Sequence, residues 1–293
     1  MMPEGLQRRA VARLRILSAR KKPFAMHIAE RIAAILVCAV VLGPITGKPA
    51  LAFDPSKVFA EEKPTVRTIF KFFFSARKKG QEEDAIGALK YAADQGNHAA
   101  QWKLGRMYQT GDGVKKNPAE AFGFFKRIVE NYSDARPGSA DWQFTANAMV
   151  ALGRYYNMGV PEAGISRDPA EALTMYTTAA TYFGHPEAQF ELARMYLEGD
   201  NSQGDVIQAA RMLKTAADNG HVGAEALLGH LLFEGQHLRR DPARGLSMMM
   251  SAQKRATGDQ YAWISQMQEE AFALATEDER RSAIAMQQQI ASK

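Results

Sequence analysis

Apolar residues recur at three- and four-residue steps along most of the chain, in short runs that polar turns separate. The segment 187–220 shows this pattern clearly, because it contains two amphipathic runs with a polar turn between them. The apolar face of the first run consists of Ala188, Leu192, Met195 and Tyr196, and that of the second consists of Ala210, Leu213 and Ala217. The pattern predicts a hairpin of two α-helices, which is too small to bury both faces without neighbours.

Residues that favour helix ends stand at the borders of these two runs. Gly199 follows the first run, where a left-handed C-terminal cap is expected, and Gly220 closes the second run. Asp205 is followed three residues later by Gln208, which is the spacing of a capping box. We therefore expect the second helix of this hairpin to begin at Asp205.

The same hairpin pattern occurs four times along the chain. Leucines followed by glycine or alanine lie 48, 40 and 36 residues apart, at Leu104, Leu152, Leu192 and Leu228. The second helices are predicted to begin at Asn117, Asp168, Asp205 and Asp241, and the small residues that follow are Ala121, Ala172, Ala210 and Gly245. This repetition predicts an all-α protein, an α/α solenoid in which each helix-turn-helix hairpin packs against the next.

The repeats divide the chain into segments. Four regular hairpins are expected at about 99–131, 147–184, 187–220 and 223–254. The segment 65–96 is a divergent first repeat, whose phenylalanines either cover the open end of the solenoid or form an exposed patch for a partner or a membrane surface. Two capping helices are predicted in 259–291, where Thr276 and Glu279 have capping-box spacing.

The first 52 residues have the layout of a secretory signal peptide. Basic residues precede an apolar run from Ile32 to Leu42, and Ala50-Leu51-Ala52 supplies an A-x-A cleavage site before Phe53. The apolar run is shorter than the ~20 residues that a membrane-spanning helix needs. Met1 and Met26 are both compatible with this reading as start sites. We therefore predict a mature protein of residues 53–293, a single solenoid located in the periplasm.

Removal of this segment changes the charge of the protein. The whole chain has 37 basic and 32 acidic residues and a formal net charge of +5. Nine of the basic and two of the acidic residues lie in 1–52, so the remaining 28 and 30 give the mature chain a net charge of −2. The electrostatic argument for a nucleic-acid partner therefore disappears. Cys38 is removed as well, so the mature chain contains no cysteine for a disulfide.

The sequence lacks the common catalytic and metal-binding motifs. It contains no G-x-S-x-G, H-E-x-x-H or C-x-x-C. Gly111-Asp112-Gly113 lacks the Lys-Ser/Thr of a phosphate loop, and the segment from Asp200 lacks the glycine and the glutamate of a calcium loop. We therefore predict a protein that is not an enzyme and has neither cofactor nor metal; the alternative is an active site assembled across several repeats.

Three histidines follow glycines that end repeats, namely His98, His185 and His221. One interpretation is that each imidazole caps a helix or packs at the turn between repeats. The other is that these imidazoles become charged together as the pH falls through ~6.5 and loosen the stack of hairpins.

Basic residues also occupy one equivalent position of the first helices, directly after the leucine and its small neighbour. These residues are Arg106, Arg154, Arg194 and His230, and Gln109 and Asn157 complete the predicted partner-binding set. Equivalent positions of a solenoid form a row along one surface, and arginine suits the carboxylates of an acidic partner. The alternative is a solvated face on which the charges pair with Glu191 and Glu198.

The repeat resembles a known family. The pattern A-x-x-x-L-G-x-x-Y-x-x-G-x-G-V-x-x-[ND]-P-x-x-A, from Ala100 to Ala121, is similar to the Sel-one-like repeat, a relative of the tetratricopeptide repeat. The resemblance covers about 83–254. Cysteine-rich bacterial members of this family bind or hydrolyse β-lactams and rely on a disulfide in each repeat, whereas this mature chain has no cysteine.

A second resemblance covers the whole mature chain. A signal peptide, then F-D-P-S-K from Phe53, an aromatic-rich lead and cysteine-free repeats resemble the negative regulators of exopolysaccharide production from rhizobia and their relatives. The resemblance implies a periplasmic repressor that binds the sensory domain of a membrane sensor histidine kinase and keeps its two-component system off. It further implies that acid or a host signal relieves repression, in part through a periplasmic protease. The alternative is a periplasmic Sel-one-like enzyme or binding module acting on β-lactams or peptidoglycan fragments.

Overall fold

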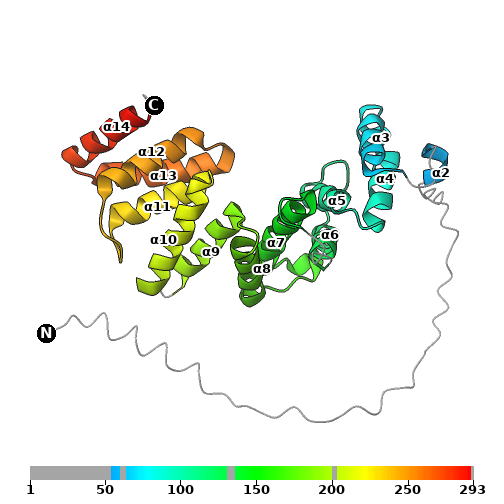
Figure 1. The fold of residues 1–293 in the computed structure, drawn as a ribbon, viewed down its shortest axis with the longest axis horizontal. Coiled ribbons are helices and arrows are strands. Elements are labelled where there is room, and N and C mark those ends of the chain that lie inside the picture. Colours follow the sequence, from blue (N-terminus) through cyan, green and yellow to red (C-terminus); the bar gives the residue numbers. More distant parts are fainter. Residues whose placement is uncertain (1–53, 60–63, 131–135, 200–202, 292–293) are drawn as a thin grey trace, which may run out of the picture. The chain divides into compact units, whose positions relative to one another are not determined.

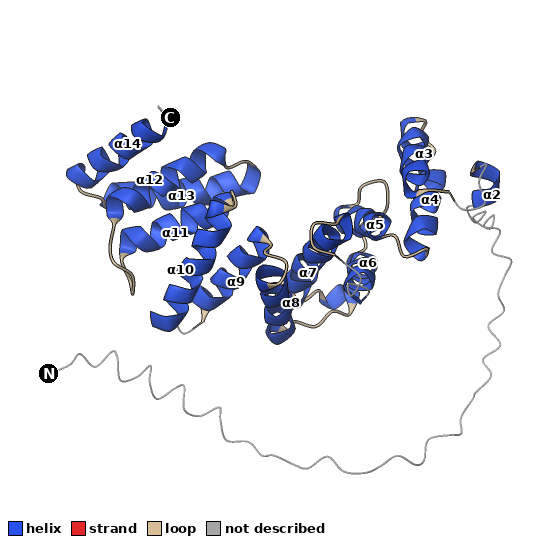
Figure 2. Cartoon of the chain, in the orientation of Figure 1, coloured by secondary structure: helices blue, strands red, loops and turns tan. Residues whose placement is uncertain are grey.

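The computed structural model describes residues 54–59, 64–130, 136–199 and 203–291, and within these ranges it contains helices and no strand (Figures 1 and 2). The proposed signal peptide and its cleavage site lie outside the described residues. In chain order the helices are α2 (Pro55–Val58), α3 (Val66–Lys78), α4 (Glu82–Asp94), α5 (His98–Thr110), α6 (Pro118–Glu130), α7 (Ala140–Met158), the 3-10 helix η2 (Pro161–Ala163), α8 (Pro169–Thr181), α9 (Pro186–Glu198), α10 (Gln203–Asp218), α11 (Val222–Glu234), α12 (Pro242–Arg255), α13 (Gly258–Leu274) and α14 (Glu277–Ala291).

The helices from α3 to α12 form five consecutive hairpins. Within each hairpin the first helix packs against the second, and each second helix then packs against the first helix of the next hairpin. The two last helices depart from this order, since α13 and α14 each pack against α12. The chain is therefore an α/α solenoid closed by helices of a different arrangement, as the repeats predicted.

The four equivalent leucines are core residues of successive hairpins. Leu104 and Leu192 are completely buried, Leu152 is 2% exposed and Leu228 is 7% exposed. Burial of a leucine side chain stabilises a protein by roughly 1.5–3 kcal/mol, so each hairpin gains a substantial contribution from this one position. The leucines lie in different hydrophobic clusters along the solenoid, which confirms that the repeat defines the core.

The small residue after each leucine allows the second helix to approach closely. A Cβ atom on Gly105 would lie 2.5 Å from Cε1 of Phe125, and one on Gly153 would lie 2.6 Å from Cε1 of Tyr176. At Gly229 the neighbour is backbone, because the Gly245 carbonyl oxygen lies 2.7 Å from the position of a Cβ. Glycine at these positions is therefore a packing requirement, which explains the Leu-Gly pairs of the sequence.

One backbone hydrogen bond recurs in the turn inside the hairpins. The amide of the residue that precedes each second helix donates to a carbonyl of the first helix, from Asn117 to Tyr108 (2.9 Å), from Asp168 to Tyr156 (2.8 Å) and from Asp241 to Leu232 (2.8 Å). The side chains of the same three donors accept hydrogen bonds from the first amides of α6, α8 and α12. The predicted N-caps of these three helices are thereby confirmed.

The hairpin of α9 and α10 differs from the prediction at its turn. Gly199 has a φ of −71°, so it does not adopt the left-handed cap that was expected. Helix α10 begins at Gln203, which places Asp205 inside the first turn, and the predicted N-cap at Asp205 is wrong. The buried face of α10 consists of Val206, Ala209, Leu213 and Ala216, whereas Ala210 and Ala217 are half-buried.

The residue of α10 that corresponds to Ala121, Ala172 and Gly245 is therefore Ala209, one position before the predicted Ala210. Ala209 precedes the core residues Leu213 and Ala216 by the same numbers of residues as Ala121 precedes Phe125 and Ile128. Ala209 follows Asp205 by four residues, the spacing that separates Asn117 from Ala121, Asp168 from Ala172 and Asp241 from Gly245, so the predicted Ala210 was one residue out of register.

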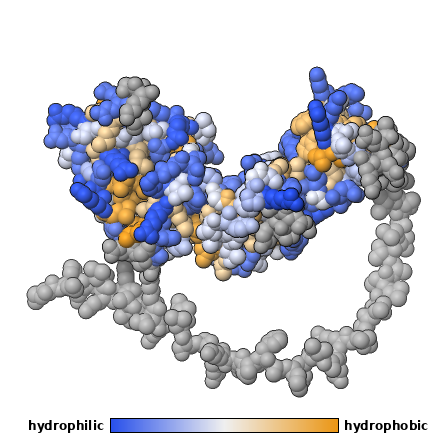
Figure 3. Space-filling view, in the orientation of Figure 1, coloured by the Kyte–Doolittle hydropathy of each residue, from blue (hydrophilic) through white to orange (hydrophobic). Residues whose placement is uncertain are grey.

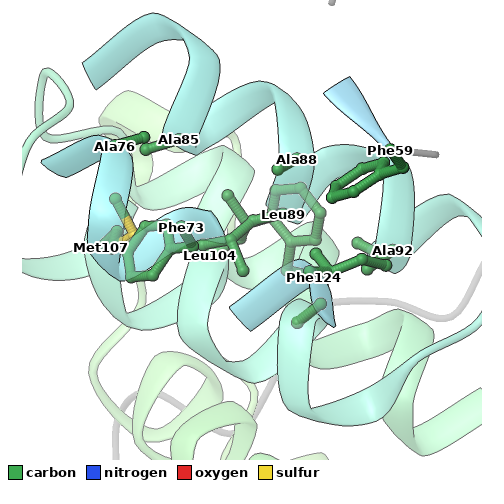
Figure 4. Close-up of a cluster of buried hydrophobic side chains, with 13 residues drawn as sticks. Phe59, Phe73, Ala76, Ala85, Ala88, Leu89, Ala92, Leu104, Met107 and Phe124 are labelled. Atoms are coloured by element: carbon green, nitrogen blue, oxygen red, sulfur yellow. The ribbon is translucent and has the colours of Figure 1, made fainter. Parts of the chain in front are cut away.

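The phenylalanines of the first hairpin are divided between the core and the surface. Phe73 is completely buried between α3 and the following helices, close to Leu89 and Leu104 (Figure 4). Phe59, just after α2, packs edge-on against Phe72 with ring centroids 5.6 Å apart. In contrast, the side chain of Phe74 is 62% exposed. The aromatic stretch therefore seals the first hairpin and leaves one aromatic ring at the surface.

The capping box predicted at the start of α14 is present. The backbone amide of Thr276 donates to Oε2 of Glu279 (2.9 Å), and the amide of Glu279 donates to Oγ1 of Thr276 (3.3 Å). Gln287 of the same helix is buried and donates to the carbonyl oxygen of Ser247 on α12 (2.7 Å). These contacts fix α14 on the last regular hairpin.

Candidate partner-binding surface

Helix α9 carries a row of charged residues on one face. Glu187, Glu191, Arg194 and Glu198 follow one another at steps of four, three and four residues, which places them along one side of the helix. Arg194 donates to Glu191 (3.4 Å) and to Glu198 (3.1 Å) within this row. The row therefore contains one cation among three carboxylates.

Arg154 of α7 joins this row from the preceding hairpin. Its Nε donates to Oε1 of Glu191 at 3.0 Å, and its Nη2 donates to Oε1 of Glu187. Burial opposes the charge of Arg154, but the two carboxylates outweigh it and raise the pKa of the guanidinium above its usual value. Arg154 is thus held in a fork of two carboxylates between α7 and α9.

His221, directly before α11, links the same glutamate to the following hairpin. Its Nδ1 accepts the backbone amide of Ala224 (2.9 Å), and its Nε2 lies 2.9 Å from Oε2 of Glu187. Because Nδ1 is an acceptor, the geometry fits a neutral imidazole that donates from Nε2 to the carboxylate. The imidazole also stacks on the ring of Phe190, with centroids 4.6 Å apart.

Glu187 is therefore the point at which three hairpins meet. Burial alone would raise the pKa of its carboxyl group, but the hydrogen bond from His221 and the charge of Arg154 outweigh burial. The net effect holds the pKa of Glu187 below its ordinary value, so the carboxylate stays ionised. An ionised Glu187 binds α7, α9 and α11 to one another.

His185 occupies the position of α9 that corresponds to His221 of α11. Its Nε2 lies 3.0 Å from Oδ1 of Asn147 on α7, whereas its buried Nδ1 has no hydrogen-bond partner among the described residues. Burial lowers the pKa of the imidazole, with further lowering by the charges of Arg154 and His221 and an opposing effect of Glu187. His185 thus remains neutral in the folded protein to a lower pH than a solvated histidine.

His98 does not share this position. Asn97 caps α5 through a hydrogen bond from the amide of Ala100 (2.9 Å), and His98 is already the first residue of the helix. The imidazole is buried, and its Nδ1 lies 3.4 Å from Oδ1 of Asp141 without the geometry of a hydrogen bond. Two of the three histidines are therefore equivalent, and the third is displaced by one residue.

The remaining members of the predicted set lie on the first helices but are not brought into the cluster. Arg106 is exposed and donates to Gln109 (2.6 Å), and the backbone carbonyl of Asn157 accepts from Arg167 (2.8 Å). His230 lies 3.4 Å from Glu234 of its own helix. The row of basic residues is thus largely a row of paired charges, with Glu191 and Glu198 among the partners.

A groove opens beside this cluster between α9, α11 and α13. It has a volume of about 480 Å³ and is lined by Phe190, Leu227, Trp263 and Met267 together with Glu187, Arg194, His221, Asp259 and Gln260. In Figure 3 apolar surface shows over α11 and over the first hairpin. The groove therefore combines an apolar lining with charged residues at its edges.

Comparison with known proteins agrees with this architecture. The family model of the Sel1 repeat matches residues 98–131, 146–181, 186–221 and 222–249. The exopolysaccharide production negative regulator of Rhizobium meliloti is 40% identical over 256 residues, which are 87% of this chain and 92% of that protein. The regulator of the same name from Rhizobium leguminosarum is 38% identical, over 83% of this chain and 89% of that protein. The chain contains Sel1 repeats and belongs to the family of these regulators.

A solved structure of another Sel1-repeat protein has a similar fold. The crystal structure of a Sel1 repeat protein from Oxalobacter formigenes is 25% identical, with a TM-score of 0.50, and covers 67% of this chain and 74% of that protein. The hairpin architecture is therefore that of experimentally determined Sel1-repeat proteins.

No group of three or more His, Cys, Asp or Glu side chains in the residues that the structure describes is placed to hold a metal ion. None of the described helices has the length and apolar character needed to cross a membrane.

Sequence reasoning missed several residues of this surface. Arg194, Glu191 and Glu198 were named from the sequence, and the four-residue step back from Glu191 was a signal that could have added Glu187 to them. Asp259 and Trp263 gave no such signal, because α13 lies beyond the regular repeats and its place beside α11 follows from the fold alone.

Proposed function

We propose that this protein is a periplasmic negative regulator of exopolysaccharide production, which binds the sensory domain of a membrane sensor histidine kinase and keeps its two-component system off. The observation that carries this proposal is the 40% identity to a regulator of that name over 87% of this chain and 92% of the relative. Because the similarity extends over nearly the full length of both proteins, it supports assigning the role of the whole relative to this chain. A match of the repeats alone would support only a shared fold.

The arrangement of the first helices supports regulation by binding. A solenoid presents side chains of several hairpins along one surface, which suits recognition of another folded protein. We assign this contact to the first helices that carry Arg106, Gln109, Arg154, Asn157, Arg194 and His230. The described residues of these helices place charged and apolar side chains next to one another, as protein-binding surfaces commonly do.

We further propose that acid relieves repression through the histidines between hairpins, His98, His185 and His221. Protonation of His185 would place a cation near Arg154 and His221, with Glu187 the one carboxylate that opposes it. Protonation of His221 at Nδ1 would remove the acceptor that caps α11. Loosened hairpins would then be open to a periplasmic protease, which removes the repressor.

The direct test of the role is a strain that lacks this protein. Deletion is expected to raise exopolysaccharide production, and return of the full-length chain is expected to restore the lower level. An unchanged level of exopolysaccharide in the deletion strain would contradict the proposal. A fusion of alkaline phosphatase to the C-terminus checks the location, because this enzyme becomes active only in the oxidising periplasm.

An assay with the purified protein separates this role from that of an enzyme or a cell-wall-binding module. The purified mature chain, residues 53–293, is incubated with benzylpenicillin and with muropeptides, and hydrolysis and binding are measured. The regulator is expected to show neither activity, and binding or turnover of either compound would favour the alternative.

A further inference from the structure

The groove between α9, α11 and α13 has a lining suited to a side chain from another molecule. The half-buried Leu227, Trp263 and Met267 provide apolar surface around a volume of about 480 Å³, and the buried Phe190 also lines it. The core formed by α9, α10 and α11 buries Trp263 and Leu227 only in part. Part of their apolar surface is therefore available in the groove. Burial of such surface is the main source of binding energy at protein–peptide contacts.

The charged residues at the groove have an excess of negative charge. Among the residues that line the groove, Glu187 and Asp259 are carboxylates and Arg194 is the basic residue, and Arg194 pairs with Glu191 and Glu198 outside the lining. His221 is neutral in the tautomer that its contacts favour, and Arg255, which precedes α13, pairs with Glu225 of α11. Arg154 and Arg194 of the predicted basic row are therefore already paired with carboxylates of the protein.

Asp259 is the carboxylate best placed to meet a partner. It is exposed in the first turn of α13 and lines the groove, whereas both oxygens of Glu187 are engaged by Arg154 and His221. A cation that approaches the apolar lining would therefore find Asp259 at the edge of the groove. A basic partner suits this edge of the groove, whereas the arginine row, if it binds a partner, suits an acidic one.

We propose that the groove between α9, α11 and α13 binds a peptide segment of the partner in which a large apolar side chain stands beside a lysine or arginine. The apolar side chain enters between Phe190 and Trp263, and the cation of the segment meets Asp259. This proposal deepens the proposed function, since it rests on that function for the identity of the partner as the kinase sensory domain. The apolar and basic character proposed for the segment is argued from the lining of the groove alone.

Site-specific photo-cross-linking in the periplasm tests this proposal. The photoreactive residue p-benzoylphenylalanine replaces Gln260, which lines the groove, in an otherwise unchanged full-length chain. The matched control places it at Tyr261, the next residue of α13, which is 50% exposed and is not among the residues of the groove. The cross-linked peptide is then sequenced by mass spectrometry.

We expect position 260 to capture a segment with an apolar residue next to lysine or arginine, at a yield about tenfold above that of position 261. The substitution Asp259→Lys, added to the variant at position 260, is expected to lower the yield about tenfold, because like charges at a contact oppose binding. Asp278→Lys on α14, whose side chain is 89% exposed, is the control and is expected to leave the yield unchanged.

Three results would overturn the proposal: equal yields at positions 260 and 261, a captured segment without a basic residue, or capture of a second copy of this chain. A failure of the proposed function gives a different result from a failure of the groove proposal. If the captured basic segment belongs to a protein other than the kinase, the proposed function is contradicted and the groove's chemistry stands. If the kinase domain binds the chain and position 260 captures nothing, the groove proposal alone fails.

Discussion

At the scale of single residues, Glu187 connects the hairpins more directly than any residue singled out in the sequence. Its two oxygens receive Arg154 from α7 and His221 from the start of α11, while the residue itself belongs to α9. Hydrogen bonds to a charged group contribute roughly 1.5–3 kcal/mol each when they are shielded from water, and Glu187 is about two-thirds buried in this contact.

Replacement of this carboxylate tests its contribution to stability. In Glu187→Gln the amide retains an acceptor for His221 but loses the ion pair with Arg154, so we expect the free energy of unfolding to fall by about 1–2 kcal/mol. Urea titration followed by circular dichroism at pH 7.5 measures the change. The control Glu198→Gln alters an ion pair whose carboxylate is 60% exposed, and its effect is expected to stay below about 0.5 kcal/mol. Equal effects of the two substitutions would contradict this account of Glu187.

The lowered pKa of His185 predicts a loss of stability in acid. The unfolded chain takes up a proton near pH 6.5, whereas the folded chain resists protonation until a lower pH, so stability decreases as the pH falls below ~6.5. The pKa of Glu187 is also lowered, but that contribution is present above ~4.3 and is lost only below it. The window from pH 7.5 to 5 therefore reports on His185 and not on Glu187.

The variant His185→Asn isolates this effect. Asparagine caps α5 at the equivalent residue, Asn97, so the substitution keeps a side chain suited to the N-cap while it removes the titrating group. We expect the melting temperature of the unmodified chain to fall between pH 7.5 and 5 and that of the variant to fall less. Parallel profiles for the two proteins would exclude His185 as a source of acid sensitivity.

At the scale of the helix, close packing inside each hairpin explains why small residues follow the core leucines. Gly153 lies against the ring of the buried Tyr176, and Gly105 lies against Phe125 in the same way. The sequence predicted these positions because their spacing is regular. It failed at α10, where the buried small residue is Ala209, four residues after Asp205 as in the other hairpins, and the predicted Ala210 is one residue too late.

A pair of glycine substitutions tests this packing. Gly153→Ala would place a methyl group 2.6 Å from Tyr176, and we expect a loss of about 1–3 kcal/mol because the ring has to move. Gly123→Ala, inside α6, meets no atom within 4 Å and is expected to gain about 0.5–1 kcal/mol from its helix propensity. Thermal unfolding compares the two, and a stabilising Gly153→Ala would refute the close approach of α7 and α8.

At the scale of the whole molecule, the fold could be predicted from the sequence and the binding surface only in part. The repeat of leucine, small residue and helix cap specifies hairpins that depend on their neighbours, so one regular pattern predicts the architecture. Contacts such as those from Arg154 to Glu187 and from His221 to Glu187 join residues 33 and 34 positions apart, and their pairing follows from how the hairpins stack. The groove depends further on α13, which lies beside α11 outside the repeat.

The central claim is that this solenoid represses by direct contact with a kinase sensory domain. Isothermal titration calorimetry of the mature chain, residues 53–293, with the purified extracytoplasmic domain of the kinase that controls exopolysaccharide synthesis tests it most directly. We predict a 1:1 complex at pH 7.5 that weakens at least about tenfold at pH 5, since hairpins that lose order in acid bind less well. Absence of heat and of any complex at pH 7.5, with both proteins folded, would contradict the account.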